Sequence, residues 1–161
     1  MLFKRLLLTA LAALSFGFCH AQNGQLSYED LKFLVHNNLP IADTFLMVKG
    51  YKIVKKNDVK KTRNYSITPP NGIYENTSIR QDGKKIYIEI ESNSIEQYNL
   101  IHDSIVQFLD KSSSTAGIQV FATKDLGSIY IMLDDATTVD PLKKEYTIQV
   151  VASKNITSYN N

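Results

Sequence analysis

Residues 74–91, YENTSIRQDGKKIYIEIE, decide the fold class of this chain. Three isoleucines in this stretch alternate with tyrosine or glutamate and therefore share one face of an extended segment: Ile86, Ile88 and Ile90. The Asp-Gly pair within residues 81–83 is typical of a tight turn between two strands. The pattern predicts a β-hairpin of residues 74–80 and 84–91, with one face in the core and the other in solvent.

The segment after the hairpin predicts a helix and then more strands. Residues 94–97, SIEQ, have the sequence of a capping box, in which Ser94 and Gln97 each satisfy the other's backbone N–H. Six apolar or aromatic residues continue the helix along one stripe: Ile95, Tyr98, Ile101, Ile105, Phe108 and Leu109. Three strands are then predicted: residues 118–123, 129–133 and 145–152.

The segment before the hairpin predicts helices first and strands second. Ser27, with Asp30 three residues later, resembles a capping box and begins a helix that reaches about residue 37. A proline in the first turn and a glycine at the end favour a second helix over residues 40–49. An edge strand over residues 45–55 is the alternative, because this run is rich in β-formers. Two strands and a turn follow: residues 51–56, 64–68 and 69–72.

These elements predict an α+β domain in which amphipathic helices pack on one face of an antiparallel sheet, or of more than one sheet. Helices followed by a run of strands occur twice along the chain, which allows an architectural pseudo-repeat. A strict alternation of strand and helix is absent, and this disfavours a parallel, dinucleotide-binding type of sheet. We expect a single domain over residues 22–153 and a flexible tail over residues 154–161.

Residues 1–21 predict an export signal. Two cations precede an apolar run over residues 6–18 that is too short to span a bilayer, and Ala21 is a small residue at the cleavage position. We expect cleavage after Ala21 and a periplasmic or secreted mature chain. Lipid attachment at Cys19 is the less favoured alternative, because a bulky phenylalanine stands where lipoprotein signals carry a small residue.

Removal of this signal would leave a neutral chain without a thiol. The full sequence has 18 Lys+Arg and 16 Asp+Glu, and Lys4 and Arg5 account for the whole excess. A neutral chain argues against nucleic acid as a partner, since nucleic-acid binders carry a basic excess. Cys19 is the only cysteine, so the mature chain would have no disulfide and no thiolate metal ligand. It also lacks an apolar run of transmembrane length.

Sequence patterns of catalysis and metal binding are not found. His36 and His102 would be the histidines of the mature chain, and neither belongs to a zinc-binding pattern such as His-x-x-x-His. Gly-x-Ser-x-Gly is absent, and the glycines occur singly, so neither a serine nucleophile nor a phosphate-binding loop is indicated. Glu89 and Glu91 have the pattern of an ordinary solvent face, and the acidic loop around Asp135 lacks the ligand spacing of an EF-hand. We predict no catalytic residue, metal site or cofactor.

Two features suggest binding. Residues 49–63 carry seven lysines and arginines against Asp58 alone, which would suit an acidic partner, a phosphorylated glycan or anionic lipid headgroups. The alternative is an edge strand and loop whose lysines prevent pairing with other edges. Tyr87 shares the solvent face of its strand with two glutamates and is the best placed exposed tyrosine. The candidate interaction residues are Lys52, Lys55, Lys56, Lys60, Lys61, Arg63 and Tyr87.

The sequence therefore favours an exported, non-enzymatic binding module for a protein, peptide or glycan of the cell envelope. A small secreted hydrolase or metal-dependent enzyme built from scattered His, Asp and Tyr side chains is the alternative. An enzyme would bring His36 or His102 into a cleft beside a carboxylate. A binding module would present a flat apolar or tyrosine-rich surface.

Overall fold

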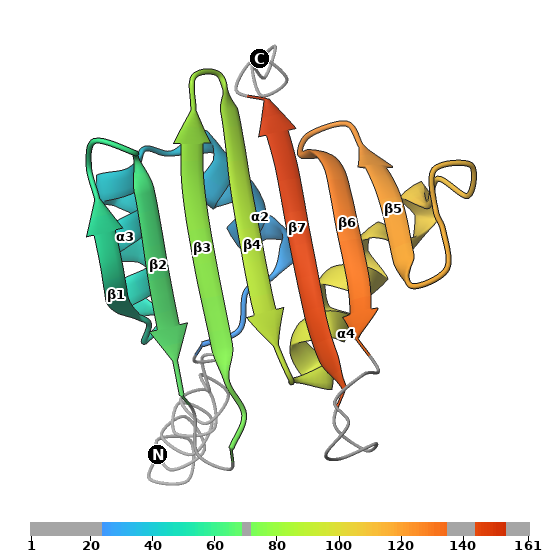
Figure 1. Cartoon of the computed structure of the whole chain (residues 1–161), viewed down its shortest axis with the longest axis horizontal. Coiled ribbons are helices and arrows are strands. Elements are labelled where there is room, and N and C mark those ends of the chain that lie inside the picture. The colour runs from blue at the N-terminus through green and yellow to red at the C-terminus, as the bar shows by residue number, and fades with distance from the viewer. Residues whose placement is uncertain (1–23, 69–71, 135–143, 154–161) are drawn as a thin grey trace, which may run out of the picture.

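Seven strands form one antiparallel sheet in the computed structural model, which describes residues 24–68, 72–134 and 144–153 (Figure 1). The strands lie in the spatial order β1-β2-β3-β4-β7-β6-β5. Their bounds are β1 (Lys52–Asn57), β2 (Thr62–Ile67), β3 (Glu75–Asp82), β4 (Lys85–Ser92), β5 (Ile118–Thr123), β6 (Gly127–Asp134) and β7 (Glu145–Ser153). The helices of the described ranges are α2 (Tyr28–His36), α3 (Leu39–Val48) and α4 (Ile95–Ile105), followed by the 3-10 turn η2 (Val106–Phe108). The predicted α+β class with an antiparallel sheet is confirmed.

The β3–β4 hairpin lies near the centre of the sheet and follows the alternation in its sequence. Buried residues alternate with more exposed ones along both strands. The ladder extends to the pair Asp82 and Lys85, so the turn consists of Gly83 and Lys84 rather than the residues 81–83 expected from the sequence. Gly83 has φ +57°, a left-handed conformation that glycine adopts at little steric cost.

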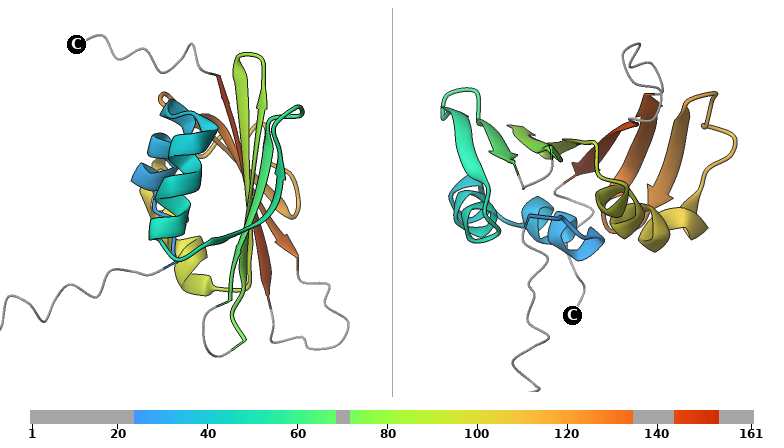
Figure 2. Two further views of the ribbon diagram at one scale, coloured as in Figure 1. Left: turned by 90° about the vertical axis from the view of Figure 1, so that its left-hand side faces the viewer. Right: turned by 90° about the horizontal axis from the view of Figure 1, so that it is seen from below.

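The hydrophobic core lies between the sheet and the helices. Figure 2 shows the three helices on one side of the sheet, and the other side, called the open face below, carries none of them. Alternate residues of β4 and β7 are buried: Ile86, Ile88, Ile90, Ile148 and Val150. They belong to one core cluster with residues of α2, α3 and α4: Leu31, Leu34, Leu46, Ile101 and Ile105. The period of two in the strands thus separates a core face from the open face.

Local signals begin both N-terminal helices where the sequence predicts them. Ser27 caps α2 and forms a complete capping box with Asp30. Asn38 caps α3 through its side chain, and a proline occupies the first turn. The second helix is therefore confirmed with the bounds Leu39–Val48. The alternative edge strand over residues 45–55 is wrong, because its first residues belong to this helix.

Gln97 does not complete the capping box predicted at the start of α4. Ser94 accepts a hydrogen bond from the Gln97 backbone N–H, as expected. The Gln97 carboxamide instead binds the backbone of Leu26: Oε1 accepts from the Leu26 N–H at 2.7 Å, and Nε2 donates to the Leu26 carbonyl at 2.7 Å. Both residues are fully buried. Gln97 therefore holds the first described residues against the start of α4.

We expect Gln97→Leu to lower the free energy of unfolding by about 2–4 kcal/mol, because a buried N–H and a buried carbonyl of Leu26 lose their partners. Urea-induced unfolding followed by circular dichroism measures this change. Gln107→Leu, at an exposed position in η2, is the matched control, with an expected change below about 0.5 kcal/mol. Equal stability of the two variants would contradict the role assigned to Gln97.

Several predictions concern residues outside the described ranges. They are the export signal at residues 1–21, most of the turn at residues 69–72, the acidic loop around Asp135 and the tail at residues 154–161. These remain predictions. Among the helices of the described ranges, none has the length and apolar character that crossing a bilayer requires.

Candidate binding site on the open face

The register of the sheet decides which side chains the open face presents. The core residues of β4 alternate with Tyr87, Glu89 and Glu91, so these three lie on the open face. Their cross-strand partners share that face: Arg80, Ser78 and Asn76 on β3, and Val151, Gln149 and Thr147 on β7. The centre of the open face is therefore mostly polar, and it contains the tyrosine that the sequence analysis singled out.

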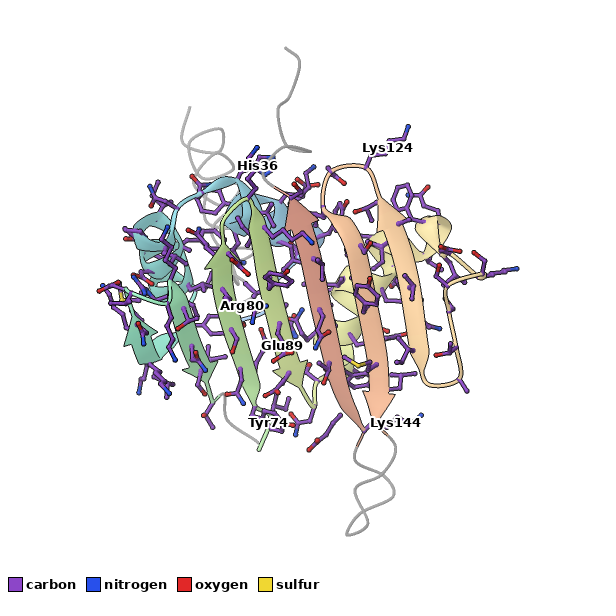
Figure 3. All side chains as sticks on the ribbon, turned by 45° about the horizontal axis from the view of Figure 1, so that its top comes forward. His36, Tyr74, Arg80, Glu89, Lys124 and Lys144 are labelled. Atoms are coloured by element: carbon purple, nitrogen blue, oxygen red, sulfur yellow. The ribbon has the colours of Figure 1, made fainter. Side chains whose placement is uncertain are left out.

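A shallow hollow of about 370 Å³ lies at this centre. Strands β2, β3, β4 and β7 contribute its polar lining: Thr62, Asn64, Ser78, Arg80, Tyr87, Glu89 and Gln149. Figure 3 shows Arg80 and Glu89 on the central strands of this face. The volume is at the lower end of the range of small-ligand sites, and the site is open to solvent along the sheet.

Arg80 lies across the ring of Tyr87, with its Cζ 4.3 Å from the ring centroid. The two residues face each other directly across the β3–β4 ladder. A cation–π interaction at an exposed site contributes about 0.5–1 kcal/mol, enough to favour one position of the guanidinium. None of the ion pairs between described residues involves Arg80. Its planar set of N–H donors is therefore available to a ligand carboxylate.

Glu89 and Gln149 form the second polar pair of the hollow. The Gln149 Nε2 donates to Glu89 Oε2 at 2.6 Å, and both side chains are half-buried. This hydrogen bond leaves the Gln149 amide oxygen and further lone pairs of the Glu89 carboxylate as acceptors. Ser78, opposite Glu89, and Asn64, opposite Ser78, add a hydroxyl and an amide. The hollow thus offers hydrogen-bond donors and acceptors side by side.

The lysines predicted to bind a partner do not line this hollow. They are exposed on β1 and in the turn after it, and we call this set the basic edge: Lys52, Lys55, Lys56, Lys60 and Lys61. β1 is the first strand in the order of the sheet, two strands away from β3. The candidate interaction residues therefore belong to two surfaces: Tyr87 to the open face, and the lysines to one edge.

Arg63 belongs to neither surface. Its side chain is 3% exposed, and its Nε donates to the two carboxylate oxygens of Asp43 at 3.1 and 3.2 Å. Its Nη2 donates to Asp58 at 2.6 Å, and the Tyr65 hydroxyl donates to Asp43 at 2.7 Å. Burial lowers the pKa of Arg63, but the hydrogen bonds to Asp43 and Asp58 outweigh burial and raise it overall. Arg63 joins β2 to α3, and its burial removes it from the candidate interaction residues.

Glu75 is a second buried ionisable residue, and the sequence analysis did not single it out. It is 3% exposed, and the Tyr51 hydroxyl contacts its carboxyl group and also lies 2.6 Å from the Gly24 carbonyl oxygen. Burial raises the pKa of Glu75 to about 8, although Lys49 lowers it. A protonated Glu75 can donate to the Tyr51 oxygen while Tyr51 donates to Gly24, so each group has a partner. The sequence contains a signal for this burial. Residues two apart in a strand share a face, so Glu75, four residues before the buried Ile79, lies on the core face.

Neither histidine lines the hollow on the open face. His36 lies at the end of α2, and Figure 3 shows it at one end of the molecule, away from Arg80 and Glu89. His102 stacks on Tyr98 with ring centroids 4.9 Å apart, and its Nδ1 lies 3.3 Å from the exposed carboxylate of Asp103. Within the described ranges, no three His, Cys, Asp or Glu side chains are placed to share a metal ion. The side chains gathered at the hollow are suited to holding a ligand.

Comparisons of the chain with models of protein families, with curated proteins and with solved structures give no match. The function is therefore inferred from the geometry of the open face and of the sheet edges.

Proposed function

We propose that this protein is an exported binding protein that holds an acidic glycan on the open face of its sheet. The observation that carries the proposal is the stack of Arg80 on Tyr87 within a polar hollow. The guanidinium binds a carboxylate of the glycan through two parallel N–H···O hydrogen bonds. Because Tyr87 restrains the guanidinium before binding, less conformational freedom is lost when the ligand arrives.

The polar lining favours a glycan over a protein surface. A sugar hydroxyl donates and accepts at once, and Glu89, Gln149 and Ser78 provide both functions on adjacent strands. The core of a protein–protein interface is instead enriched in apolar and aromatic groups. The isoleucines of the central strands point to the helices, so the apolar surface at the centre of the open face comes from Val151, the Tyr87 ring and side-chain carbons of the polar lining. An acidic peptide is the ligand class that the experiment must separate from a glycan.

We expect an oligosaccharide of galacturonic acid to bind, and its methyl ester to bind at least about tenfold more weakly, because esterification removes the charge that Arg80 recognises. Arg80→Met should weaken binding of the acid by a similar factor, and Arg80→Lys should restore only part of it, since lysine cannot bind a carboxylate in bidentate geometry. Isothermal titration calorimetry measures the affinities.

Lys85→Met, at the end of the same hairpin, is the matched control for this series and should bind as the native chain does. Equal affinity for the acid and its methyl ester would contradict recognition of a carboxylate by Arg80. Tighter binding of a glutamate-rich peptide than of the oligosaccharide, lost in Arg80→Met, would reassign the site to a peptide.

Export is the second part of the proposal. It is supported by the two cations and the short apolar run that precede Ala21. Gly24 and Leu26, only a few residues beyond the expected cleavage position, are held by Tyr51 and Gln97. Intact-mass analysis of the protein isolated from cells should give a chain that begins at Gln22. A lipid-modified chain that begins at Cys19 would favour the alternative signal.

We also propose that the domain is a pseudo-repeat of helices followed by strands. The strand order supports this arrangement, because the last strands of the two runs, β4 and β7, are neighbours and the first strands, β1 and β5, are the two edges. A second segment built on the same plan extends the first sheet and covers it with a further helix.

A further inference from the structure

The two edges of the sheet differ in how their backbone is covered (Figure 1). At β5, residues 109–115 cover the outer edge: the Asp110 N–H donates to the Val120 carbonyl at 2.8 Å, and the Val120 N–H donates to Ser114 Oγ at 3.0 Å. At β1, none of the residues that the structure describes pairs with the outer edge. One edge is therefore closed, and the other presents backbone N–H and C=O groups to a further strand.

The side chains of β1 differ between its two faces. Lys52 and Lys55 pair with Ser66 and Asn64 of β2 and therefore lie on the open face. Ile53 pairs with the buried Tyr65 and lies on the helix side, and the next residue, Val54, is 68% exposed at a bulge. A strand added beside β1 would meet Lys52 and Lys55 on the open face, and Ile53 followed by Lys56 on the helix side.

Charge decides which strand can be added. The ion pairs between described residues include only one lysine of the basic edge: Lys56 lies 3.8 Å from the exposed carboxylate of Asp58. They do not include the other four, Lys52, Lys55, Lys60 and Lys61. A second copy of β1 would place lysines opposite lysines, which destabilises a ladder. An acidic strand would place carboxylates opposite them. The lysines that prevent self-association therefore attract an acidic partner.

We infer that β1 accepts an extended acidic segment of another protein as an eighth strand, with acidic side chains facing Lys52 and Lys55 and apolar side chains on the side of Ile53. Backbone hydrogen bonds to the open edge supply affinity, and Lys52 and Lys55 on the open face, with Ile53 on the helix side, supply specificity. The inference rests on the backbone edge of β1 and does not depend on the proposed glycan site, although Lys55 pairs with Asn64 of the hollow's lining.

A fluorescent peptide of about six residues that alternates glutamate and valine is a suitable probe, since a typical strand has about this length and β1 has 6 residues. We expect it to bind in fluorescence anisotropy, and Lys52→Gln/Lys55→Gln to weaken binding at least about tenfold. Lys84→Gln/Lys85→Gln, which removes two exposed lysines at the far end of the β3–β4 hairpin, is the matched control and should leave binding unchanged. Higher salt should weaken binding, because the charges lie at an exposed edge.

Two N-methylated forms of the peptide test for strand addition itself. In a strand, alternate residues direct their N–H groups to opposite edges, so methyl groups on the odd residues block one edge and methyl groups on the even residues block the other. We expect one form to lose binding and the other to keep it. Hydrogen exchange should show new protection of β1 amides in the presence of the unmodified peptide.

Binding of both N-methylated forms as tightly as the unmodified peptide would overturn the inference, because charge attraction alone would then explain the affinity. Binding to vesicles of anionic phospholipid but not to the peptide, lost in Lys52→Gln/Lys55→Gln, would overturn it in favour of a membrane surface. Arg80→Met should not change peptide binding, and Lys52→Gln/Lys55→Gln should leave unchanged the preference of the hollow for the free acid over its methyl ester. The two proposals can therefore fail separately.

Discussion

Glu75→Gln is expected to make the protein more stable than the native chain at alkaline pH, by about 5 kcal/mol once Glu75 is fully ionised. The difference arises because burial raises the pKa of Glu75 from 4.5 to about 8 in the folded protein. Glutamine keeps the length of the side chain and an N–H donor for the Tyr51 oxygen. It has no ionised form, so it never places a charge in this buried position.

The direction of the pH dependence follows from the raised pKa. Below about pH 4.5, Glu75 is protonated in both the folded and the unfolded chain, and its stabilising contribution is complete. As the pH rises, the unfolded chain releases the proton first, and the contribution is lost progressively until the pH passes about 8. The free energy of unfolding of the native chain, relative to that of Glu75→Gln, should therefore decrease as the pH rises from about 4.5 to about 8 and remain constant above that.

Urea-induced unfolding at a series of pH values from 4 to 9 measures this profile for both chains. Glu91→Gln is the matched control, because Glu91 is exposed on the open face of the adjacent strand. The curves of Glu91→Gln and the native chain should stay parallel. A constant difference between Glu75→Gln and the native chain across the whole range would show that folding does not raise the pKa of Glu75.

Asp43→Ala is expected to lower the free energy of unfolding by about 3–5 kcal/mol, because it leaves the buried guanidinium of Arg63 without its main partner. Asp43 accepts from Arg63 Nε and from the Tyr65 hydroxyl, so one substitution removes hydrogen bonds of two buried residues. Burial and the hydrogen bond to Asp43 also raise the pKa of Tyr65. The loss is large because the total stability of a domain of this size is about 5–15 kcal/mol.

Asp58→Ala is the control for this prediction. Asp58 also accepts from Arg63, at 2.6 Å, but its side chain is 71% exposed, and we expect a loss below about 1 kcal/mol. Replacing both members of the pair, as Asp43→Leu with Arg63→Met, should recover part of the stability lost in Asp43→Ala, since no buried charge then remains unpaired, while the Tyr65 hydroxyl still lacks its acceptor. Equal losses for Asp43→Ala and Asp58→Ala in urea-induced unfolding would contradict the buried pair.

The elements that the sequence predicted well are those with strong local patterns. Three isoleucines in alternation identified β4 and its core face, and the side chains of Ser27 and Asp30 marked the start of α2. The turn between β3 and β4 was predicted at residues 81–83 but consists of Gly83 and Lys84. The preference of Asp-Gly for turns does not define the last residue pair of the ladder. For Gln97, the local pattern predicted a cap, but its carboxamide binds Leu26, 71 residues away.

The candidate sites were predicted only in part. Tyr87 was placed on the open face correctly, because alternation determines the side of a strand. Its stacking with Arg80 was not foreseen, since the pairing of these two positions depends on the register of the hairpin. Arg63 was grouped with the lysines by its charge. Its alternation with Tyr65 places it on the buried side, where charge predicts an ion pair rather than an exposed surface.

By itself, the sequence indicated where most helices and strands lie and which face of β4 enters the core, because these depend on side chains one to four residues apart. Only the tertiary structure decided that β7 lies beside β4, that Gln149 therefore meets Glu89, and that no described residue pairs with the outer edge of β1. The pairing of β7 with β4 and the contact of Gln149 with Glu89 join residues far apart in the chain. Both require that one face of the sheet is buried in a single register, and local sequence patterns do not specify that register.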